Sequence, residues 1–212
     1  MTGEEARGRL GAERVVGILR KVPADRAEAV VDALVDAGVG IVEVTLESER
    51  SLWLISRLRE RAGVTAAAGT VRSARDVDRA AEAGAEILFC PATRAEVVER
   101  ALARGVAVVP AALTPSEIEA AWGLGPAAVK LFPGSVGGPD YLRAVRAPLG
   151  DVPLVVTGGV DAVTAPEFLR AGAVAVSTGS SVVSAERVAR GDIEAIARAA
   201  ADLLAAVRDV PR

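Results

Sequence analysis

Short apolar runs alternate with longer amphipathic segments along this 212-residue chain. Eight runs rich in Val, Ile, Leu and Ala predict strands, at 15–19, 41–45, 65–69, 86–90, 106–110, 127–132, 153–157 and 173–178. Most are continuously apolar rather than alternating, which is typical of parallel strands covered on both faces. Segments with a helical spacing of apolar residues lie between and after them, at 24–37, 49–62, 73–83, 93–103, 114–122, 138–147, 161–171 and 191–208.

The predicted helices carry start and stop signals. Ser73, Thr114 and Asp161 stand where an N-cap is expected, and Pro115 follows Thr114 at a first helical position. Five of the helices are followed by a glycine suited to a left-handed C-terminal cap: Gly38, Gly63, Gly84, Gly105 and Gly172. These signals indicate that the alternation reflects real element boundaries.

Eight strand–helix units, with one short extra helical segment at about 3–11, predict an α/β fold. We expect a single (β/α)₈ TIM barrel that occupies residues 1–212 as one domain. The alternative is an open doubly wound sheet, which carries a glycine-rich turn after its first strand. Here the first strand is followed by Leu19-Arg20-Lys21-Val22-Pro23, so the barrel is favoured.

Composition excludes several classes of function. The net charge of −3 and the scattered arginines argue against a nucleic-acid partner. The chain has no histidine and a single cysteine, Cys90, which removes the commonest metal ligands and general bases. No signal peptide is visible, and the longest apolar runs, such as 105–113, are too short to span a bilayer. We therefore expect a soluble cytoplasmic protein without a membrane partner.

Only two of the 25 basic residues are lysines, Lys21 and Lys130. Lys130 stands near the end of an apolar, strand-like run and is followed by Leu131-Phe132-Pro133-Gly134. A desolvated lysine can lose its proton and attack a carbonyl to form a Schiff base, which arginine cannot do. A strand-end lysine that reaches into solvent is the alternative interpretation.

Polar residues gather at the carboxyl ends of the predicted strands, where a TIM barrel carries its chemistry. Glu43 lies between Val42 and Val44 in an apolar strand, where a carboxylate is costly unless it is paired or used. The second and sixth strands lie opposite each other in an eight-stranded barrel, so Glu43 and Lys130 can both project into the mouth. They form either a structural ion pair or a Schiff-base lysine with a proton-shuttling carboxylate.

Two glycine-containing loops follow the seventh and eighth predicted strands, at Thr157-Gly158-Gly159 and Ser177-Thr178-Gly179-Ser180. The phosphate site of this fold forms at these loops, from backbone N–H groups and a short helix start. Residues 182–187 are the candidate for that helix. A pair of tight βα turns is the alternative.

Four other residues at strand ends are weaker candidates. Arg20 suits a fork-like contact to a substrate carboxylate. Thr45 and Thr70 are candidates to bind the same ligand, although Thr70 can equally cap a helix. Cys90 is interpreted as a small buried hydrophobe.

The chain resembles the class I 2-keto-3-deoxy-6-phosphogluconate (KDPG) aldolases and their 4-hydroxy-2-oxoglutarate (KHG) and 6-phosphogalactonate relatives. The resemblance extends from about residue 15 to residue 183. It rests on motifs in order at strand ends: Gly17-Ile-Leu-Arg20, Ile41-Val-Glu-Val-Thr-Leu46, Ala68-Gly-Thr-Val71, Thr114-Pro-Ser-Glu117, Val129-Lys-Leu-Phe-Pro133, Gly138-Pro-Asp-Tyr-Leu142 and Thr157-Gly-Gly-Val160.

The resemblance implies a role for each matching residue. Lys130 forms the imine with the keto acid, and Glu43 acts through water as general acid and base. Arg20, Thr45 and Thr70 bind the substrate carboxylate and hydroxyl end, and Thr157 lies near the substrate hydroxyls. The terminal phosphate is received by Gly158, Gly159, Gly179 and Ser180. The substrate is a small keto-deoxy sugar acid, cleaved to pyruvate and glyceraldehyde 3-phosphate without a metal or cofactor, by a homotrimer.

The sequence departs from the family at four positions. Glu47 stands where the phosphogluconate branch often has arginine, and family glycines appear as Ala67, Ala92 and Ala111. These changes leave the Schiff-base chemistry in place and put the identity of the substrate in question. Two other functions stay open: a phosphate-binding isomerase or synthase on the same barrel, and a catalytically silent sugar-phosphate-binding protein.

Overall fold

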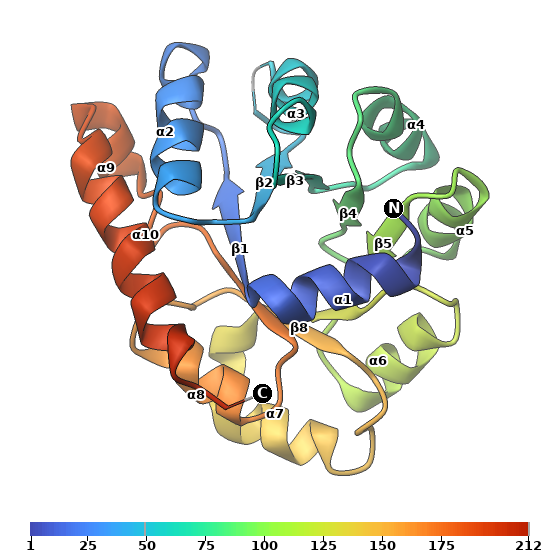
Figure 1. The fold of residues 1–212 in the computed structure, drawn as a ribbon. Coiled ribbons are helices and arrows are strands. Elements are labelled where there is room, and N and C mark those ends of the chain that lie inside the picture. The colour runs from blue at the N-terminus through green and yellow to red at the C-terminus, as the bar shows by residue number, and fades with distance from the viewer. Residues whose placement is uncertain (49, 212) are drawn as a thin grey trace.

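The computed structural model describes residues 1–48 and 50–211, and Figure 1 shows their arrangement. Its strands are β1 (Val15–Leu19), β2 (Ile41–Thr45), β3 (Thr65–Gly69), β4 (Ile87–Phe89), β5 (Ala107–Val109), β6 (Ala111–Ala112), β7 (Val129–Leu131), β8 (Leu154–Thr157) and β9 (Ala175–Thr178). Its helices are α1 (Gly3–Glu13), α2 (Ala24–Asp36), α3 (Ser51–Arg59), α4 (Ala74–Glu82), α5 (Ala95–Ala103), α6 (Pro115–Trp122), the 3₁₀ turn η1 (Gly134–Val136), α7 (Gly138–Arg146), α8 (Thr164–Arg170), α9 (Ala185–Arg190) and α10 (Ile193–Arg208). The first residue of the predicted 49–62 helix lies outside the described residues.

All strand pairs are parallel, in the order β5-β4-β3-β2-β1-β9-β8-β7-β6. The two ends of this order, β5 and β6, are consecutive pieces of chain on either side of Pro110, so the sheet closes on itself. Hydrogen bonds join the seam: the Ala127 N–H donates to the Val108 carbonyl at 3.0 Å and the Lys130 N–H to the Pro110 carbonyl at 2.8 Å. The predicted (β/α)₈ TIM barrel is confirmed.

The predicted fifth strand, 106–110, contains β5, which pairs with β4. After Pro110 the chain continues in a further short strand that the sequence did not predict, β6, which pairs with β7. Pro110 separates them because proline has no N–H to donate to a ladder. Together the two pieces occupy one strand position of the barrel.

Helix α1 covers the end of the barrel where the strands begin (Figure 1). Its buried residues Ala6 and Leu10 pack against the interior apolar cluster, which includes Val16 and Ile41. Arg9 donates to the hydroxyl of Thr65, the first residue of β3, at 3.1 Å. Because α1 covers this end, a ligand site would have to lie at the opposite end, where the strands finish.

The local helix signals hold. The five C-terminal glycines all have a positive φ, between 65° and 102°. Ser73 and Thr114 cap α4 and α6, and Thr114 forms a capping box with Glu117. Helix α8 begins at Thr164 rather than at residue 161, because the Asp161 carboxylate accepts the N–H groups of Val163 and Thr164 in the turn before it.

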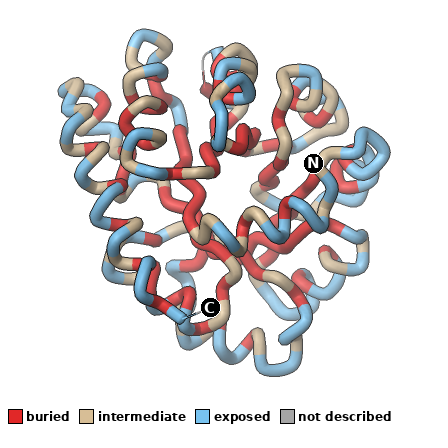
Figure 2. The backbone as a smooth tube through the Cα atoms, in the orientation of Figure 1, coloured by how far each residue is buried: buried red, intermediate tan, exposed pale blue. Residues whose placement is uncertain are grey.

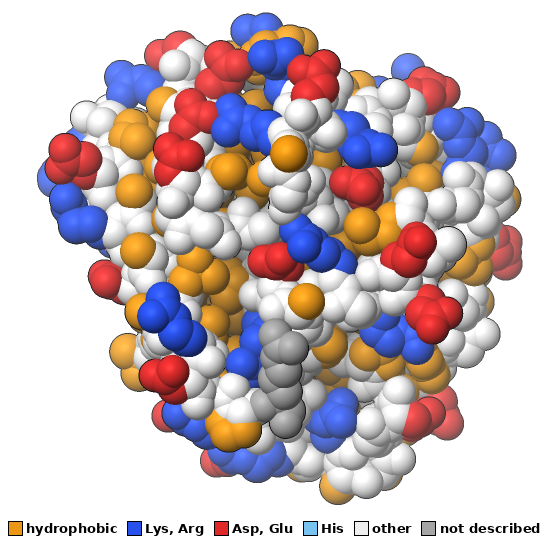
Figure 3. All heavy atoms as spheres, in the orientation of Figure 1, with side chains coloured by type: hydrophobic (Ala, Val, Ile, Leu, Met, Phe, Trp, Pro, Cys, Tyr) orange, Lys and Arg blue, Asp and Glu red, His pale blue; other side chains and the backbone are white. Residues whose placement is uncertain are grey.

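Burial follows the barrel geometry. Every residue of the nine strands is buried, and the helices expose their outer faces (Figure 2). On the face that carries α1, acidic and basic side chains are interspersed without a basic patch (Figure 3). Among the described helices none is both long and apolar enough to cross a membrane.

Candidate active site

Lys130 lies in the middle of β7 and is only 4 % exposed. Its ammonium nitrogen is 5.3 Å from the ring centroid of Phe132 and 5.9 Å from that of Phe89. Lys130 is therefore not a strand-end lysine in solvent. It is a buried amine held between two aromatic rings at the carboxyl end of the barrel.

Glu43 lies in the middle of β2 and is completely buried. Burial raises the pKa of Glu43 above its ordinary value, and the positive charges of Lys130 and Arg20 oppose this rise. Neither carboxylate oxygen accepts a hydrogen bond from the described part of the chain. A buried carboxyl without donors is costly, so this group is poised to hold or exchange a proton rather than to stabilise the fold.

The structure brings Glu43 and Lys130 within electrostatic reach without joining them. Among residues 1–48 and 50–211, no ion pair within 4.0 Å connects them, although other pairs are present, such as Arg20 with Glu47 at 3.7 Å. A structural salt bridge, the alternative considered from the sequence, is therefore not what these residues form.

Two cavities open at this end of the barrel, and both are lined by Arg20 and Phe132. The first has a volume of about 420 Å³ and the second about 410 Å³, each within the range of small-molecule sites. Lys130 lies behind this shared wall, with its side-chain nitrogen 5.3 Å from the ring centroid of Phe132. A bound molecule can thus extend into both cavities with its central carbon atoms near the amine.

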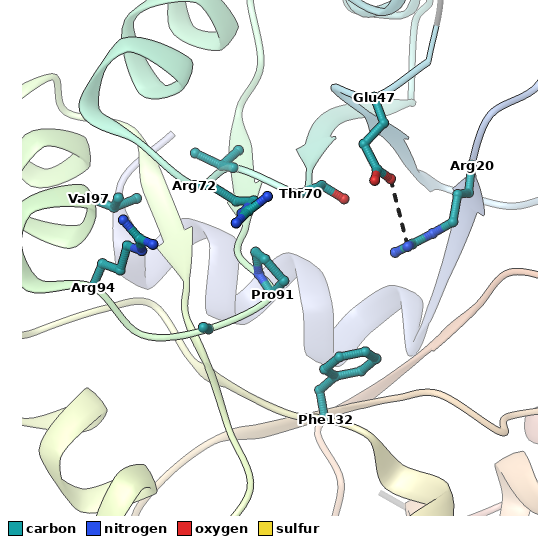
Figure 4. Close-up of a pocket in the computed structure, with 10 residues that line it drawn as sticks. Arg20, Glu47, Thr70, Arg72, Pro91, Arg94, Val97 and Phe132 are labelled. Atoms are coloured by element: carbon teal, nitrogen blue, oxygen red, sulfur yellow. Dashed lines mark ion pairs between the residues drawn. The ribbon is translucent and has the colours of Figure 1, made fainter.

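The first cavity holds Thr70 and Arg20, as predicted from the sequence, together with Glu47. Figure 4 shows Arg20 reaching across the opening toward the Glu47 carboxylate, with the Thr70 hydroxyl on the same side. Two further arginines, Arg72 and Arg94, line this cavity and were not singled out from the sequence. With three guanidinium groups and one carboxylate in its wall, the first cavity is favourable for binding an anionic group.

Thr70 has a backbone φ of 59°, an uncommon conformation for a β-branched residue. Strained backbone of this kind costs about 1–3 kcal/mol and clusters at functional sites. The conformation places Thr70 at the wall of the first cavity, directly after β3.

The second cavity is lined by both predicted glycine loops. Gly158, Gly159, Gly179 and Ser180 all contribute to its wall, and Thr157 lies at its base. Gly158 and Gly159 both have a positive φ, 94° and 74°, which explains the need for consecutive glycines. In the described structure the N–H groups of Gly158, Gly159 and Ser180 donate no hydrogen bond, so they are free to bind an anion. The short helix beside this cavity is α9, which begins at Ala185, later than the 182–187 segment expected.

Thr45 does not join either cavity. It is buried, and its hydroxyl lies 3.2 Å from that of Ser48, which in turn accepts the Lys21 N–H. Cys90 is buried, and burial raises the pKa of its thiol to about 12, with Lys130 opposing the rise. Cys90 is a small core residue, as the sequence indicated.

The four unusual positions occupy different places. Ala67 lies opposite Glu43 in the β2–β3 ladder, and Ala111 lies opposite Lys130 in the β6–β7 ladder. Ala92 and Glu47 line the first cavity. Two of the three alanines therefore adjoin the reactive pair rather than the opening.

Sequence reasoning did not single out two residues of the second cavity as ligand contacts, Phe132 and Ser177. Phe132 stands two residues after Lys130, so its side chain points to the same interior side of the strand. Ser177 stands two residues before Gly179 and follows the same alternation. The two-residue period of a strand could have identified both residues, but the sequence analysis used it only for charged side chains.

Comparison with known proteins gives a consistent result. The sequence model of a family described as KDPG and KHG aldolase matches residues 7–199. The 2-dehydro-3-deoxy-6-phosphogalactonate aldolase of Escherichia coli is 32% identical over 198 residues, which are 92% of this chain and 95% of that protein. A solved structure described as native KDPGal superimposes with a TM-score of 0.85 and 32% identity, over 92% of this chain and 95% of that one. The 2-keto-3-deoxy-6-phosphogluconate aldolase of Zymomonas mobilis, solved with 3-phosphoglycerate, gives 0.86 and 26% identity over 99% and 98%.

Proposed function

Because the chain belongs to the KDPG and KHG aldolase family, we propose that it cleaves a 6-phosphorylated 2-keto-3-deoxy sugar acid through a Schiff base on Lys130. The family is one of carbon–carbon lyases that act on keto-deoxy phosphosugar acids. The products would be pyruvate and glyceraldehyde 3-phosphate.

One observation carries the mechanism: a buried lysine and a buried, unpartnered carboxyl lie inside the barrel, behind the end where two cavities share Arg20 and Phe132 in their walls. Binding alone requires neither group. A barrel that only held a sugar phosphate would gain stability by replacing both with apolar residues. This argues against the silent binding protein considered from the sequence.

The reaction begins at the Lys130 amine. Its nitrogen attacks the C2 carbonyl of the keto acid, and loss of water leaves a protonated imine. The Glu43 carboxylate then accepts the proton of the C4 hydroxyl, and the C3–C4 bond breaks as its electrons pass into the imine to form an enamine. Glyceraldehyde 3-phosphate leaves, the Glu43 carboxylic acid returns its proton to C3, and hydrolysis releases pyruvate.

The two cavities suit the two ends of this substrate. Arg20 and Thr70 hold the carboxylate in the first cavity. The free N–H groups of the loops at Gly158, Gly159 and Ser180, with Gly179, hold the phosphate in the second. Thr157, between Lys130 and the phosphate loops, contacts the hydroxyls. We assign no ligand contact to Thr45, since its hydroxyl is bonded to Ser48.

The preferred epimer is proposed from position 47. Glu47 lies in the first cavity and draws Arg20 toward itself, where an arginine would instead add positive charge. We therefore propose cleavage of phosphorylated keto-deoxy acids in general, with the phosphogalactonate form or another analogue preferred over phosphogluconate.

Borohydride reduction in the presence of pyruvate tests the mechanism. We expect mass spectrometry to find one added pyruvyl group on the peptide that contains Lys130. Lys21, the other lysine of the chain, is the internal control and should stay unmodified. Lys130→Arg should be inactive although it keeps the charge, because a guanidinium stays protonated. Turnover without a trapped adduct would instead support an isomerase or synthase.

A further inference from the structure

Two hydroxyl groups at the mouth of the barrel are buried and have no hydrogen-bond partner in the described structure. They belong to Thr157 at the end of β8 and Ser177 in β9, which are 6 % and 2 % exposed. The two residues face each other in the β8–β9 ladder, and both line the second cavity. Buried hydroxyls are almost always hydrogen-bonded, so two adjacent exceptions in one cavity call for a ligand.

Other hydroxyls of this region are satisfied within the protein. The Thr178 and Ser181 hydroxyls lie 2.6 Å apart, and Ser181 donates to the Val160 carbonyl at 2.6 Å. Ser181 also lines the second cavity, yet its hydroxyl is already used to join the loops after β8 and β9. Among the described residues that line this cavity, Thr157 and Ser177 are the ones whose hydroxyls are buried and still have no partner.

We propose that Ser177 acts with Thr157 to bind the C5 hydroxyl of the substrate, which becomes the hydroxyl of the released aldehyde. This inference rests on the proposed function. With C2 at Lys130 and the phosphate at the glycine loops, the carbons between them pass over the ends of β8 and β9. The C4 hydroxyl gives its proton to Glu43 on β2, across the barrel, so the C5 hydroxyl falls to the Thr157–Ser177 pair.

The chemistry of the pair matches one substrate hydroxyl. A hydroxyl both donates and accepts, and two neighbouring protein hydroxyls can fill both roles, one as acceptor and one as donor. An aldehyde without this group would leave both buried hydroxyls unpaired. A site built to hydrogen-bond a substrate hydroxyl rejects an analogue that lacks it far more strongly than an apolar pocket does. Ser177 thus selects phosphorylated hydroxyaldehydes over their deoxy forms.

The test is the synthetic direction, in which pyruvate adds to an aldehyde. Two acceptors differ only in the hydroxyl: D-glyceraldehyde 3-phosphate and 3-oxopropyl phosphate. We expect the unmodified protein to prefer the first in kcat/KM by about tenfold or more. Ser177→Ala and Thr157→Val should each lower kcat/KM for the first acceptor by roughly tenfold and change the second by less than about threefold. Ser56→Ala, whose hydroxyl bonds to the Trp53 carbonyl on α3, is the matched control and should change neither.

The outcomes separate this inference from the proposed function. Equal losses on both acceptors, or none, in variants that still form the pyruvate adduct on Lys130 would overturn the role of the pair and leave the aldolase mechanism standing. If Ser177→Ala does not fold, the unmodified protein decides: equal kcat/KM for the two acceptors overturns the inference. Absence of any trapped pyruvate would overturn the proposed function itself.

Discussion

Gly69 lies against Glu43 so closely that a β-carbon at position 69 would overlap Oε1 and approach the carboxyl carbon Cδ to 2.7 Å. The two residues belong to neighbouring strands, β3 and β2. Glu43 is completely buried. The absence of a side chain at Gly69 is therefore what gives the carboxyl its place in the barrel.

Gly69→Ala should displace the Glu43 carboxyl and lower the catalytic rate by roughly 10²–10⁴-fold, the usual contribution of a general acid–base group. Steady-state kinetics with a phosphorylated keto-deoxy acid measure this loss. Gly8→Ala is the control, because a β-carbon there would meet nothing within 4 Å. A near-normal rate in folded Gly69→Ala would show that Glu43 does not need this position.

Glu43→Gln should lower the catalytic rate by a similar factor while leaving keto-acid binding largely intact, because the amide keeps the shape of the carboxyl and loses its proton exchange. Trapping of pyruvate on Lys130 and single-turnover cleavage separate the two effects. A variant with normal cleavage would assign Glu43 to structure.

The same variant should change stability with pH. Burial raises the pKa of Glu43 in the folded protein, so the folded state binds more protons at this residue than the unfolded state does. Stability is then present below the ordinary glutamate pKa of about 4.3 and is lost as pH rises through the folded value. Thermal unfolding should give Glu43→Gln the higher Tm at pH 8, with the gap closing in acid.

Glu60→Gln, an exposed change at the residue directly after α3, is the control for that experiment. It should show no such pH-dependent gain. A Tm for Glu43→Gln below that of the unmodified protein at pH 8 would contradict the argument.

Glu47→Arg should shift preference toward the phosphogluconate substrate. Arg20 and Glu47 are 3.7 Å apart and partly exposed, at 53% and 37%. The change frees Arg20 and supplies a guanidinium donor, and the hydrogen bonds of a donor depend on the substrate's configuration, in which the two epimers differ. Coulomb energies in such a setting are about 1 kcal/mol, so the shift in the ratio of kcat/KM values should be roughly tenfold or less. Glu60→Arg, the same change of charge away from both cavities, should leave the ratio unchanged; an unaltered ratio in Glu47→Arg would remove this residue from selectivity.

The protein should form a homotrimer, as the family resemblance implies. Val136 and Val163 expose 66% and 75% of their surface, although burial of such side chains is favourable. Light scattering at micromolar concentration should give three times the chain mass of 21.6 kDa. A mass of one chain would contradict the prediction.

Local signals predicted most of the architecture. Continuous apolar runs, helical spacing, and caps such as Thr114 and Gly172 are properties of neighbouring residues, so eight strand–helix units could be located before any contact was known. The same alternation placed Lys130 and Glu43 on two strands of the barrel, although the structure has each in the middle of its strand rather than at the end. The loops at Gly158 and Gly179 were found because a glycine turn is legible in sequence.

Contacts between distant segments were decided only in three dimensions. The break at Pro110 that closes the barrel depends on the β7 partner, and the Ser48 hydroxyl, which follows β2, accepts the N–H of Lys21 from the loop after β1. The approach of Arg20 to Glu47 joins two loops. None of these contacts produces a periodic pattern in the sequence, because packing of the folded chain, and not residue spacing, determines which residues meet.

The hydroxyl groups at the second cavity show most clearly what the sequence determined and what depended on the tertiary structure. In the sequence, Thr157, Ser177 and Ser181 are all hydroxyl residues at or near the ends of predicted strands, and nothing there distinguishes their roles. In the folded barrel Ser181 is satisfied by the Val160 carbonyl, whereas Thr157 and Ser177 face the cavity without a partner. A hydroxyl is structural or functional according to which donors and acceptors surround it, and those arrive from strands and loops that only the closed barrel brings together.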